Sequence, residues 1–275
     1  MDRPKVGMGY RVSMHNEIVE QLEHIEVLEI TLDHYFAATS RQVELFKSLT
    51  ELHPLISHGV GLSLGTDEPV DDRYLDQISS AIEILGVPFY SEHLAFTRAS
   101  GMELAELLPL PRTEKVAEFL IEKIRKIQSH LPVPLALENI TYYFEFPNAE
   151  TTDAEFFSLI CRETGVDVLL DIENLYVNSI NHGADPHHFI ESLPQDSVIE
   201  MHIAGGKKVG DILVDTHGHQ VVAPVLDLIH HVFTRQSPKY VILERDDRLD
   251  QIDEIQVDLD NIHESVSASL AKING

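Results

Sequence analysis

The stretch "TDAEFFSLICRETGVDVLLD", residues 152–171, contains one helix and the strand that follows it. Thr152 with Glu155 three residues later is a capping-box pattern, and Gly165 is a suitable residue to end the helix. The run "VDVLLD" (166–171) has the nearly continuous apolar character of a buried parallel strand. A helix followed at once by such a strand predicts one unit of an alternating α/β fold.

The same alternation continues along the whole chain. Short apolar runs of strand length occupy eight segments: 6–12, 25–30, 54–64, 87–93, 133–139, 166–171, 197–204 and 239–245. Segments with helical spacing of apolar residues, such as 71–86 and 113–130, separate them. Eight strands alternating with helices in 275 residues predict an α/β fold of the (β/α)8 TIM-barrel type. Since no low-complexity tract or long Gly/Ser linker divides the chain, we expect a single domain over 1–275.

An open, doubly wound sheet is the alternative α/β architecture. Such a sheet would need a phosphate-binding turn or a similar feature at its switch point. The glycine-rich stretch "GVGLSLG" (59–65) does not match the GxGxxG pattern of that turn. The barrel is therefore the favoured prediction.

Composition narrows the classes of partner. The net charge is −26, from 20 Lys and Arg against 46 Asp and Glu, so we expect neither a basic surface nor a nucleic-acid partner. No apolar run reaches the roughly 18 residues that span a bilayer, and the start "MDRPKVGMGY" lacks a signal-peptide core. The single cysteine, Cys161, rules out an internal disulfide and fits a reducing cytoplasm.

The ends of the predicted strands carry a narrow set of side chains. In a TIM barrel the active site is built at these carboxyl-terminal ends and in the loops that follow them. Histidine, carboxylate and amide groups stand there at His58, His93, Glu138, Asp171, Asn174, His202, Asp215, His217 and Glu244. Each has an ordinary explanation when taken alone. A histidine can be a hydrogen-bonded core residue, and Glu138 or Asp171 can cap the helix after its strand.

Taken together, these residues favour a metal site. Four carboxylates brought to one barrel mouth would repel one another and lose hydration unless cations lay between them. Histidines would add neutral nitrogen ligands. A single metal takes three or four protein ligands, so eight or nine candidates predict two or three metals. With no cysteine ligand, the set suits iron, manganese, zinc or cobalt, and the residue types do not choose among them.

Seven longer motifs resemble a known family. They are "ISHGVGLSLG", "SEHLAF", "ALENITYY", "LLDIENLYVNSINHG", "EMHIAGG", "VDTHGH" and "ILERDD", in this order over roughly residues 6–247. Their order is similar to that of the multinuclear non-haem iron-dependent oxidases, which include the catalytic subunit of methanobactin biosynthesis. The resemblance implies a TIM barrel with two or three irons at its mouth. It also implies O2-dependent modification of cysteines in ribosomally made peptides, often with a partner protein that delivers the peptide leader.

Matching the motifs one by one places the family's metal ligands on the same nine residues, from His58 to Glu244. The resemblance implies that Glu138 and Glu244 bridge metals. Asp215, His217 and Asn174 would serve a third metal. We expect Arg245 and Asp246, which follow Glu244 directly, to support the cluster from beside its ligands.

The chain departs from the family pattern at two places. Asp33 and His34 stand where a Glu-Asn pair is expected, and Glu173 stands where asparagine is usual. Both departures are expected to alter the pocket and therefore the substrate.

Two other functions are compatible with the same residues. One is a hydrolytic or isomerising metalloenzyme, related in fold to phosphodiesterases or sugar isomerases; the charge of −26 argues against a DNA substrate. The other is a non-catalytic metal-binding protein. Tight retention of zinc or manganese without O2 consumption would favour an isomerase, whereas thiol-dependent O2 uptake would argue against mere storage.

Overall fold

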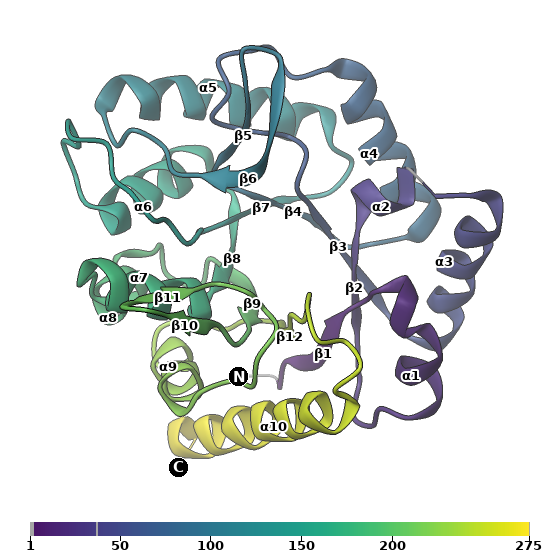
Figure 1. Cartoon of the computed structure of the whole chain (residues 1–275). Helices are drawn as coiled ribbons and strands as arrows, with labels where there is room; N and C mark the ends of the chain where they lie inside the picture. The colour runs from purple at the N-terminus through teal and green to yellow at the C-terminus, as the bar shows by residue number, and fades with distance from the viewer. Residues whose placement is uncertain (1–2, 37, 275) are drawn as a thin grey trace. The chain divides into compact units, whose positions relative to one another are not determined.

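Eight parallel strands form a closed barrel in the computed structural model, which describes residues 3–36 and 38–274 (Figure 1). Their order around the barrel is β1 (Lys5–Gly9), β2 (Leu28–Thr31), β3 (Leu55–Gly59), β4 (Tyr90–His93), β7 (Leu135–Glu138), β8 (Asp167–Asp171), β9 (Val198–Ile203) and β12 (Tyr240–Leu243). The predicted TIM barrel is confirmed.

Helices alternate with these strands. They are α1 (His15–Glu20), α2 (Leu32–Phe36), α3 (Ser40–Leu52), α4 (Asp72–Leu85), α5 (Glu114–His130), α6 (Asp153–Thr164), α7 (Ile172–His182), α8 (Pro186–Ser192), α9 (Ala223–Phe233) and α10 (Ile252–Asn274), with a short 3-10 turn at Val12–Met14. Over the ranges that the structure describes, none of them is both long enough and apolar enough to cross a membrane.

The helix that opened the sequence analysis has the expected ends. The Thr152 side chain accepts the Glu155 backbone N–H, and the Glu155 carboxylate accepts the Thr152 N–H, which completes the capping box. Gly165 ends the helix in the left-handed conformation, with φ 68°. The capping box marks where α6 begins and Gly165 marks where it ends, and β8 follows two residues later and ends at Asp171.

Contacts between Cα atoms divide the chain into two compact units. The first unit comprises Met1–Glu29, Leu169–Glu191 and Gln195–Gly275, and the second comprises Ile30–Val168 and Ser192–Pro194. We describe each unit by itself. A single domain over 1–275 stays a prediction.

Strand register aligns the candidate residues within each unit. In the second unit, β3 pairs with β4 and β4 with β7, which makes His93 the direct neighbour of Glu138. In the first unit, β12 pairs with both β1 and β9, which sets Ile242 beside His202. Strands therefore hold His93 and Glu138 in the second unit and His202 in the first.

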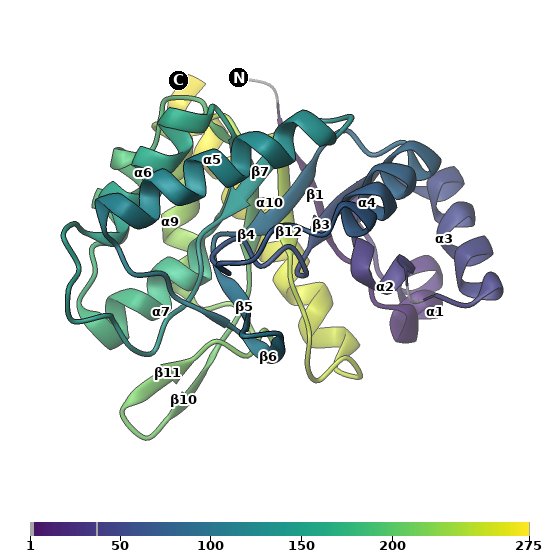
Figure 2. The ribbon, with the colours of Figure 1, turned by 90° about the horizontal axis from the view of Figure 1, so that it is seen from above.

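Two hairpins were not predicted from the sequence. In the second unit, β5 (Phe96–Ala99) pairs with β6 (Met102–Leu108); in the first, β10 (Lys207–Val209) pairs with β11 (Ile212–Val214). The β10–β11 hairpin is a narrow, projecting arm (Figure 2). Within the described residues, none of the four hairpin strands is buried, so they lack the continuous apolar runs that identify buried strands.

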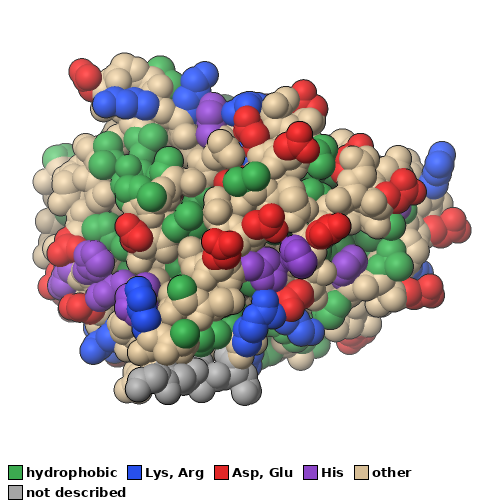
Figure 3. Space-filling model, turned by 90° about the horizontal axis from the view of Figure 1, so that it is seen from below, with side chains coloured by type: hydrophobic (Ala, Val, Ile, Leu, Met, Phe, Trp, Pro, Cys, Tyr) green, Lys and Arg blue, Asp and Glu red, His purple; other side chains and the backbone are tan. Residues whose placement is uncertain are grey.

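Acidic groups are spread widely on the surface. On the face seen from below, acidic side chains are scattered and lysine and arginine side chains are interspersed among them (Figure 3). This distribution accords with the net charge of −26.

Candidate metal centre

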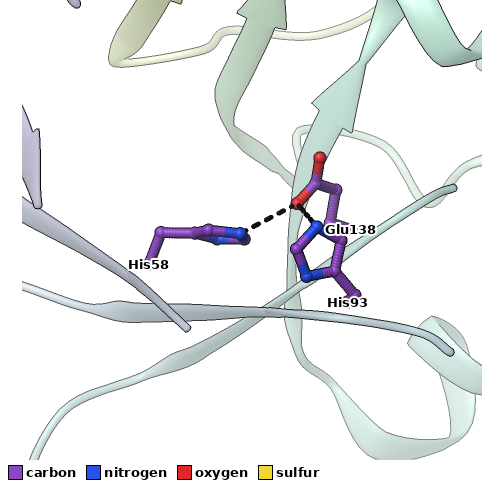
Figure 4. Close-up of side chains that lie close together, drawn as sticks. All are labelled: His58, His93 and Glu138. Carbon is purple, nitrogen blue, oxygen red and sulfur yellow. Dashed lines mark ion pairs between the residues drawn. The ribbon is translucent and has the colours of Figure 1, made fainter. Parts of the chain in front are cut away.

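Three predicted ligands meet in the second unit. His58 on β3 and His93 at the end of β4 point toward Glu138, the last residue of β7 (Figure 4). The Nε2 atoms of His58 and His93 lie 3.4 and 3.1 Å from the same oxygen, Glu138 Oε2. We call these residues the second-unit triad. Two imidazole nitrogens around one carboxylate oxygen are the donor types that first-row transition metals take in proteins.

Three further predicted ligands meet in the first unit in a similar way. His202 lies on β9, His217 in the loop after β11, and Glu244 directly after β12. The Nδ1 atoms of His202 and His217 lie 3.0 and 3.3 Å from Glu244 Oε2. We call these residues the first-unit triad. Each unit thus directs two imidazole nitrogens at one carboxylate oxygen.

Electrostatics couple the members of the first-unit triad. Burial by itself would lower the pKa of His217, but Glu244 and Asp215 raise it well above its usual range. Burial would raise the pKa of Glu244, but His217 and His202 hold it well below its usual range. The triad therefore favours a carboxylate charge on Glu244 beside positive charge, and a bound cation would take the place of the protons that supply this positive charge.

The loop segment "DTHGH" (215–219) brings two of its side chains together. Asp215 and His217 are two residues apart, and Asp215 Oδ1 lies 2.6 Å from His217 Nε2. His217 itself has a left-handed backbone, with φ 45°, which few non-glycine residues adopt. This conformation directs the two side chains toward each other.

Asp171 and Asn174 are both buried at the start of α7. Asp171 Oδ1 accepts the backbone N–H of Asn174 at 2.7 Å and so caps the helix. The capping role considered for Asp171 alone is therefore present. It uses one carboxylate oxygen and fixes the orientation of the side chain at the end of β8.

Arg245 and Asp246 face different surroundings. The Arg245 guanidinium binds Asp258 of α10, with 2.8 Å between Nη2 and Oδ2, and both side chains are buried. Asp246 Oδ2 lies 3.2 Å from His217 Nδ1. The structure thus brings Asp246 to the first-unit triad and turns Arg245 away from it.

Sequence reasoning missed the cation that does reach this triad. Arg11, two residues after β1, donates from Nε to Asp246 Oδ1 at 2.8 Å, and its Nη2 lies 3.4 Å from Glu244 Oε1. Burial would lower the pKa of Arg11, but Asp246 and Glu244 raise it. The signal was available, because Arg11 follows a strand end as the other candidates do.

Two buried carboxylates behind His202 were also missed. Glu29 Oε2 on β2 lies 2.9 Å from His202 Nε2, and Glu200 Oε1 on β9 lies 3.8 Å from the same nitrogen. Both stood inside runs that were interpreted as apolar strand cores. Glu200 precedes His202 by two residues, so strand alternation alone puts both side chains on one face.

Glu173 and Asp33, at which the chain departs from the family pattern, both interact closely with their surroundings. Glu173 is buried, and burial together with Asp171 and Asp215 raises its pKa well above the usual range. A side chain at Gly206 would place its Cβ 2.6 Å from Glu173 Oε1, so glycine is required there. Asp33 accepts the Val60 N–H at 3.0 Å.

Asp33 lines a cavity in the second unit. The cavity has a volume of about 680 Å³, a size typical of ligand sites. Its walls come from the segment after β3, the start of α4 and the hairpin strand β6. The charged side chains in its lining are four carboxylates and one guanidinium: Asp33, Asp71, Glu103, Glu106 and Arg98. Because β3 carries His58, the cavity begins just beyond a member of the second-unit triad.

Fold and site together define a (β/α)8 barrel with histidine and carboxylate clusters at its strand ends. The chain belongs to the family described as RiPP precursor modification enzymes MbnB/TglH/ChrH, which matches residues 5–267. RiPPs are ribosomally made, modified peptides, so the family resemblance inferred from the seven motifs is confirmed.

Two curated relatives, both named UPF0276 proteins, are similar to nearly the whole chain. A UPF0276 protein of Shewanella sediminis is 31% identical over 265 residues, covering 96% of this chain and 95% of the relative. A UPF0276 protein of Acinetobacter baylyi is 33% identical over 258 residues, covering 94% and 89%. Membership of the family thus rests on nearly the whole chain.

Solved structures share the fold. A D-tagatose 3-epimerase-like protein has a TM-score of 0.62 at 14% identity, covering 98% of this chain and 99% of that one. A D-allulose 3-epimerase from Methylomonas sp. has a TM-score of 0.62 at 13% identity, covering 96% and 99%. At this identity the likeness concerns the TIM barrel and brings no activity to this chain.

Proposed function

We propose that the protein is a multinuclear iron-dependent oxidase that uses O2 to modify cysteine residues of a ribosomally made peptide. Family membership supports a peptide precursor as the substrate. The observation that carries the metal part is the pair of triads, in each of which two imidazole nitrogens approach one carboxylate oxygen. Zinc or manganese would fit the same donor types.

The proposed ligands come from both units. They are His58, His93, Glu138, Asp171, Asn174, His202, Asp215, His217 and Glu244. In this proposal Glu138 and Glu244 would each hold iron through a carboxylate, and Asp215, His217 and Asn174 would hold a further iron.

Iron, when bound, would supply the electron transfer between a substrate thiol and O2. The chain's own residues would hold and orient the reactants. Arg11 would balance the negative charge of Asp246 and Glu244, which it contacts directly. The cavity beside β3 would hold the peptide segment that flanks the reacting cysteine.

A partner protein that delivers the peptide leader is part of the proposal, as is a cytoplasmic location. The buried Cys161 accords with a reducing compartment and a structural role, since burial raises the pKa of its thiol far above the usual range. An inert thiol of this kind would not compete with a substrate cysteine.

Anaerobic reconstitution with ferrous iron tests the proposal. We expect the wild-type protein to retain iron and to consume O2 when a cysteine-containing precursor peptide is added. His58→Ala and Glu138→Ala should lose iron from the second-unit triad. His130→Ala is the matched control, because His130 lies in the same unit but pairs with Asp76 on the surface. A wild-type protein that holds no iron would refute the proposal, and retained zinc or manganese without O2 uptake would favour an isomerase.

A further inference from the structure

His202 is held from both sides of its ring. Nδ1 lies 3.0 Å from Glu244 Oε2, and Nε2 lies 2.9 Å from Glu29 Oε2. The His202 side chain has no exposed surface, and that of Glu29 is 2% exposed. A neutral imidazole has one N–H and one lone pair, so a metal that took the lone pair of Nδ1 beside Glu244 would leave the proton on Nε2, facing Glu29.

We propose that Glu29 is a positioning residue that reserves Nδ1 of His202 for a metal ion. This inference rests on the proposed metal centre. In this role Glu29 accepts the Nε2–H across the 2.9 Å between Nε2 and Oε2, which holds the ring orientation and leaves the Nδ1 lone pair directed at the side of Glu244. A carboxylate behind a ligating histidine also strengthens the histidine as a donor.

The backbone holds Glu29 in place for this role. Residue Gly9 of β1 is paired with Glu29 of β2, and the Glu29 carbonyl accepts the Tyr10 N–H at 2.7 Å. The carboxylate therefore stands on a barrel strand rather than on a loop. A side chain fixed in this way can hold its partner to a small range of orientations.

Glu200 does not share the role, although it is equally buried. Its nearest oxygen lies 3.8 Å from His202 Nε2, which is too long for a hydrogen bond, whereas Glu29 is at 2.9 Å. The two glutamates thus provide a comparison in which burial is alike and Glu29 alone of the two is within hydrogen-bond distance of His202 Nε2.

The group that lies behind the His58 ring differs in charge from Glu29, which lies behind the His202 ring. Its Nδ1 lies 2.9 Å from the Ser91 hydroxyl, so a neutral group stands behind the ring. His202 should therefore depend on a charged partner in a way that His58 does not. This difference separates a specific effect of Glu29 from a general loss of fold.

The test compares Glu29→Ala, Glu29→Gln and Glu200→Gln in the full-length protein. Each metal-free variant is titrated anaerobically with Fe²⁺ against a competing chelator, and Co²⁺ absorption bands report the ligand field. We expect Glu29→Ala to weaken the binding class that includes His202 by about 10- to 100-fold and to shift its Co²⁺ bands. Glu29→Gln should lose less, because its amide oxygen still accepts the Nε2–H. Glu200→Gln should bind as the wild type does.

The outcomes distinguish this inference from the proposed function. Wild-type protein that binds metal while Glu29→Ala binds it equally well would overturn the role of Glu29 alone. An equal loss in Glu29→Gln and Glu200→Gln would also overturn it, because general burial of charge would then be the cause. Wild-type protein that binds neither Fe²⁺ nor Co²⁺ would overturn both. Thermal unfolding of the metal-free variants shows that each one is folded.

Discussion

Glu244 and Arg245 are neighbours in the chain, yet they take part in different interactions. Glu244 meets His202 and His217, whereas Arg245 binds Asp258 on the opposite side of the strand. Side chains alternate along an extended backbone, so adjacent residues face opposite sides. Residue types at strand ends predicted Glu244. They did not predict the direction of Arg245, because the sequence does not fix the last strand residue.

Glu173 offers a test at the residue scale. Its raised pKa means that the folded protein disfavours the ionised form. The stability that it contributes is thus present below the pKa of the unfolded chain and is lost as pH rises through the folded pKa. Glutamine resembles the protonated acid, so we expect Glu173→Gln to raise the melting temperature of metal-free protein at pH about 8, with the gain vanishing at pH about 4.

Differential scanning calorimetry at both pH values measures this effect. Glu118→Gln is the matched control, because Glu118 is exposed on α5. A Glu173→Gln variant that melts at or below the wild-type temperature at pH about 8 would show that ionised Glu173 is already stabilised by its surroundings.

At the scale of elements, the Arg245–Asp258 pair joins the end of β12 to α10. Burial raises the pKa of Asp258 to about 6 and lowers that of Arg245, so desolvation outweighs the attraction between them. Removing one partner leaves a buried charge unpaired. We expect Arg245→Met to lower the free energy of unfolding by about 3–5 kcal/mol, measured by denaturant titration.

A double variant separates pairing from packing. Arg245→Met with Asp258→Asn should recover most of the loss, because no charge is then stranded and the amide can still accept the Val221 N–H that Asp258 accepts. Iron content should stay unchanged in both variants. A double variant as unstable as the sum of the two single variants would contradict a stranded charge as the cause.

The observed ends of helices and strands show which sequence patterns predict an element's boundary correctly. The capping box and Gly165 gave both ends of α6, because each is a local backbone interaction. The run 54–64 proved longer than β3, Leu55–Gly59, since its apolar residues continue beyond the strand as buried Leu62 and Leu64. Apolar residues indicate burial rather than extended backbone. In the sequence, a buried apolar residue that follows a strand therefore cannot be distinguished from a residue of the strand.

At the scale of the whole molecule, eight alternating runs were enough to predict the barrel. The contacts between individual site residues were harder to predict, because they join residues that are far apart in the sequence. Arg11 and Asp246 are 235 residues apart in sequence and are joined by a hydrogen bond. Glu29 and His202 are 173 residues apart. Local patterns carry no information about such contacts until the strand order is known.

The charge of −26 makes a prediction for the molecule as a whole. Like charges on a compact protein repel one another, and salt screens that repulsion. Raising NaCl from about 0.02 M to about 0.5 M should raise the melting temperature of the metal-free protein at neutral pH, because the Debye length falls well below 10 Å. A melting temperature that falls with added NaCl would indicate that attractive ion pairs dominate instead.

Crystals of anaerobically reconstituted protein, with diffraction recorded on both sides of the iron absorption edge, test the metal centre most directly. The account predicts two or three anomalous peaks that belong to iron, with one beside Glu138 and one beside Glu244. Elemental analysis of the same sample should give the same number of irons per chain. Protein that holds no iron, or iron bound away from these two carboxylates, would contradict the account.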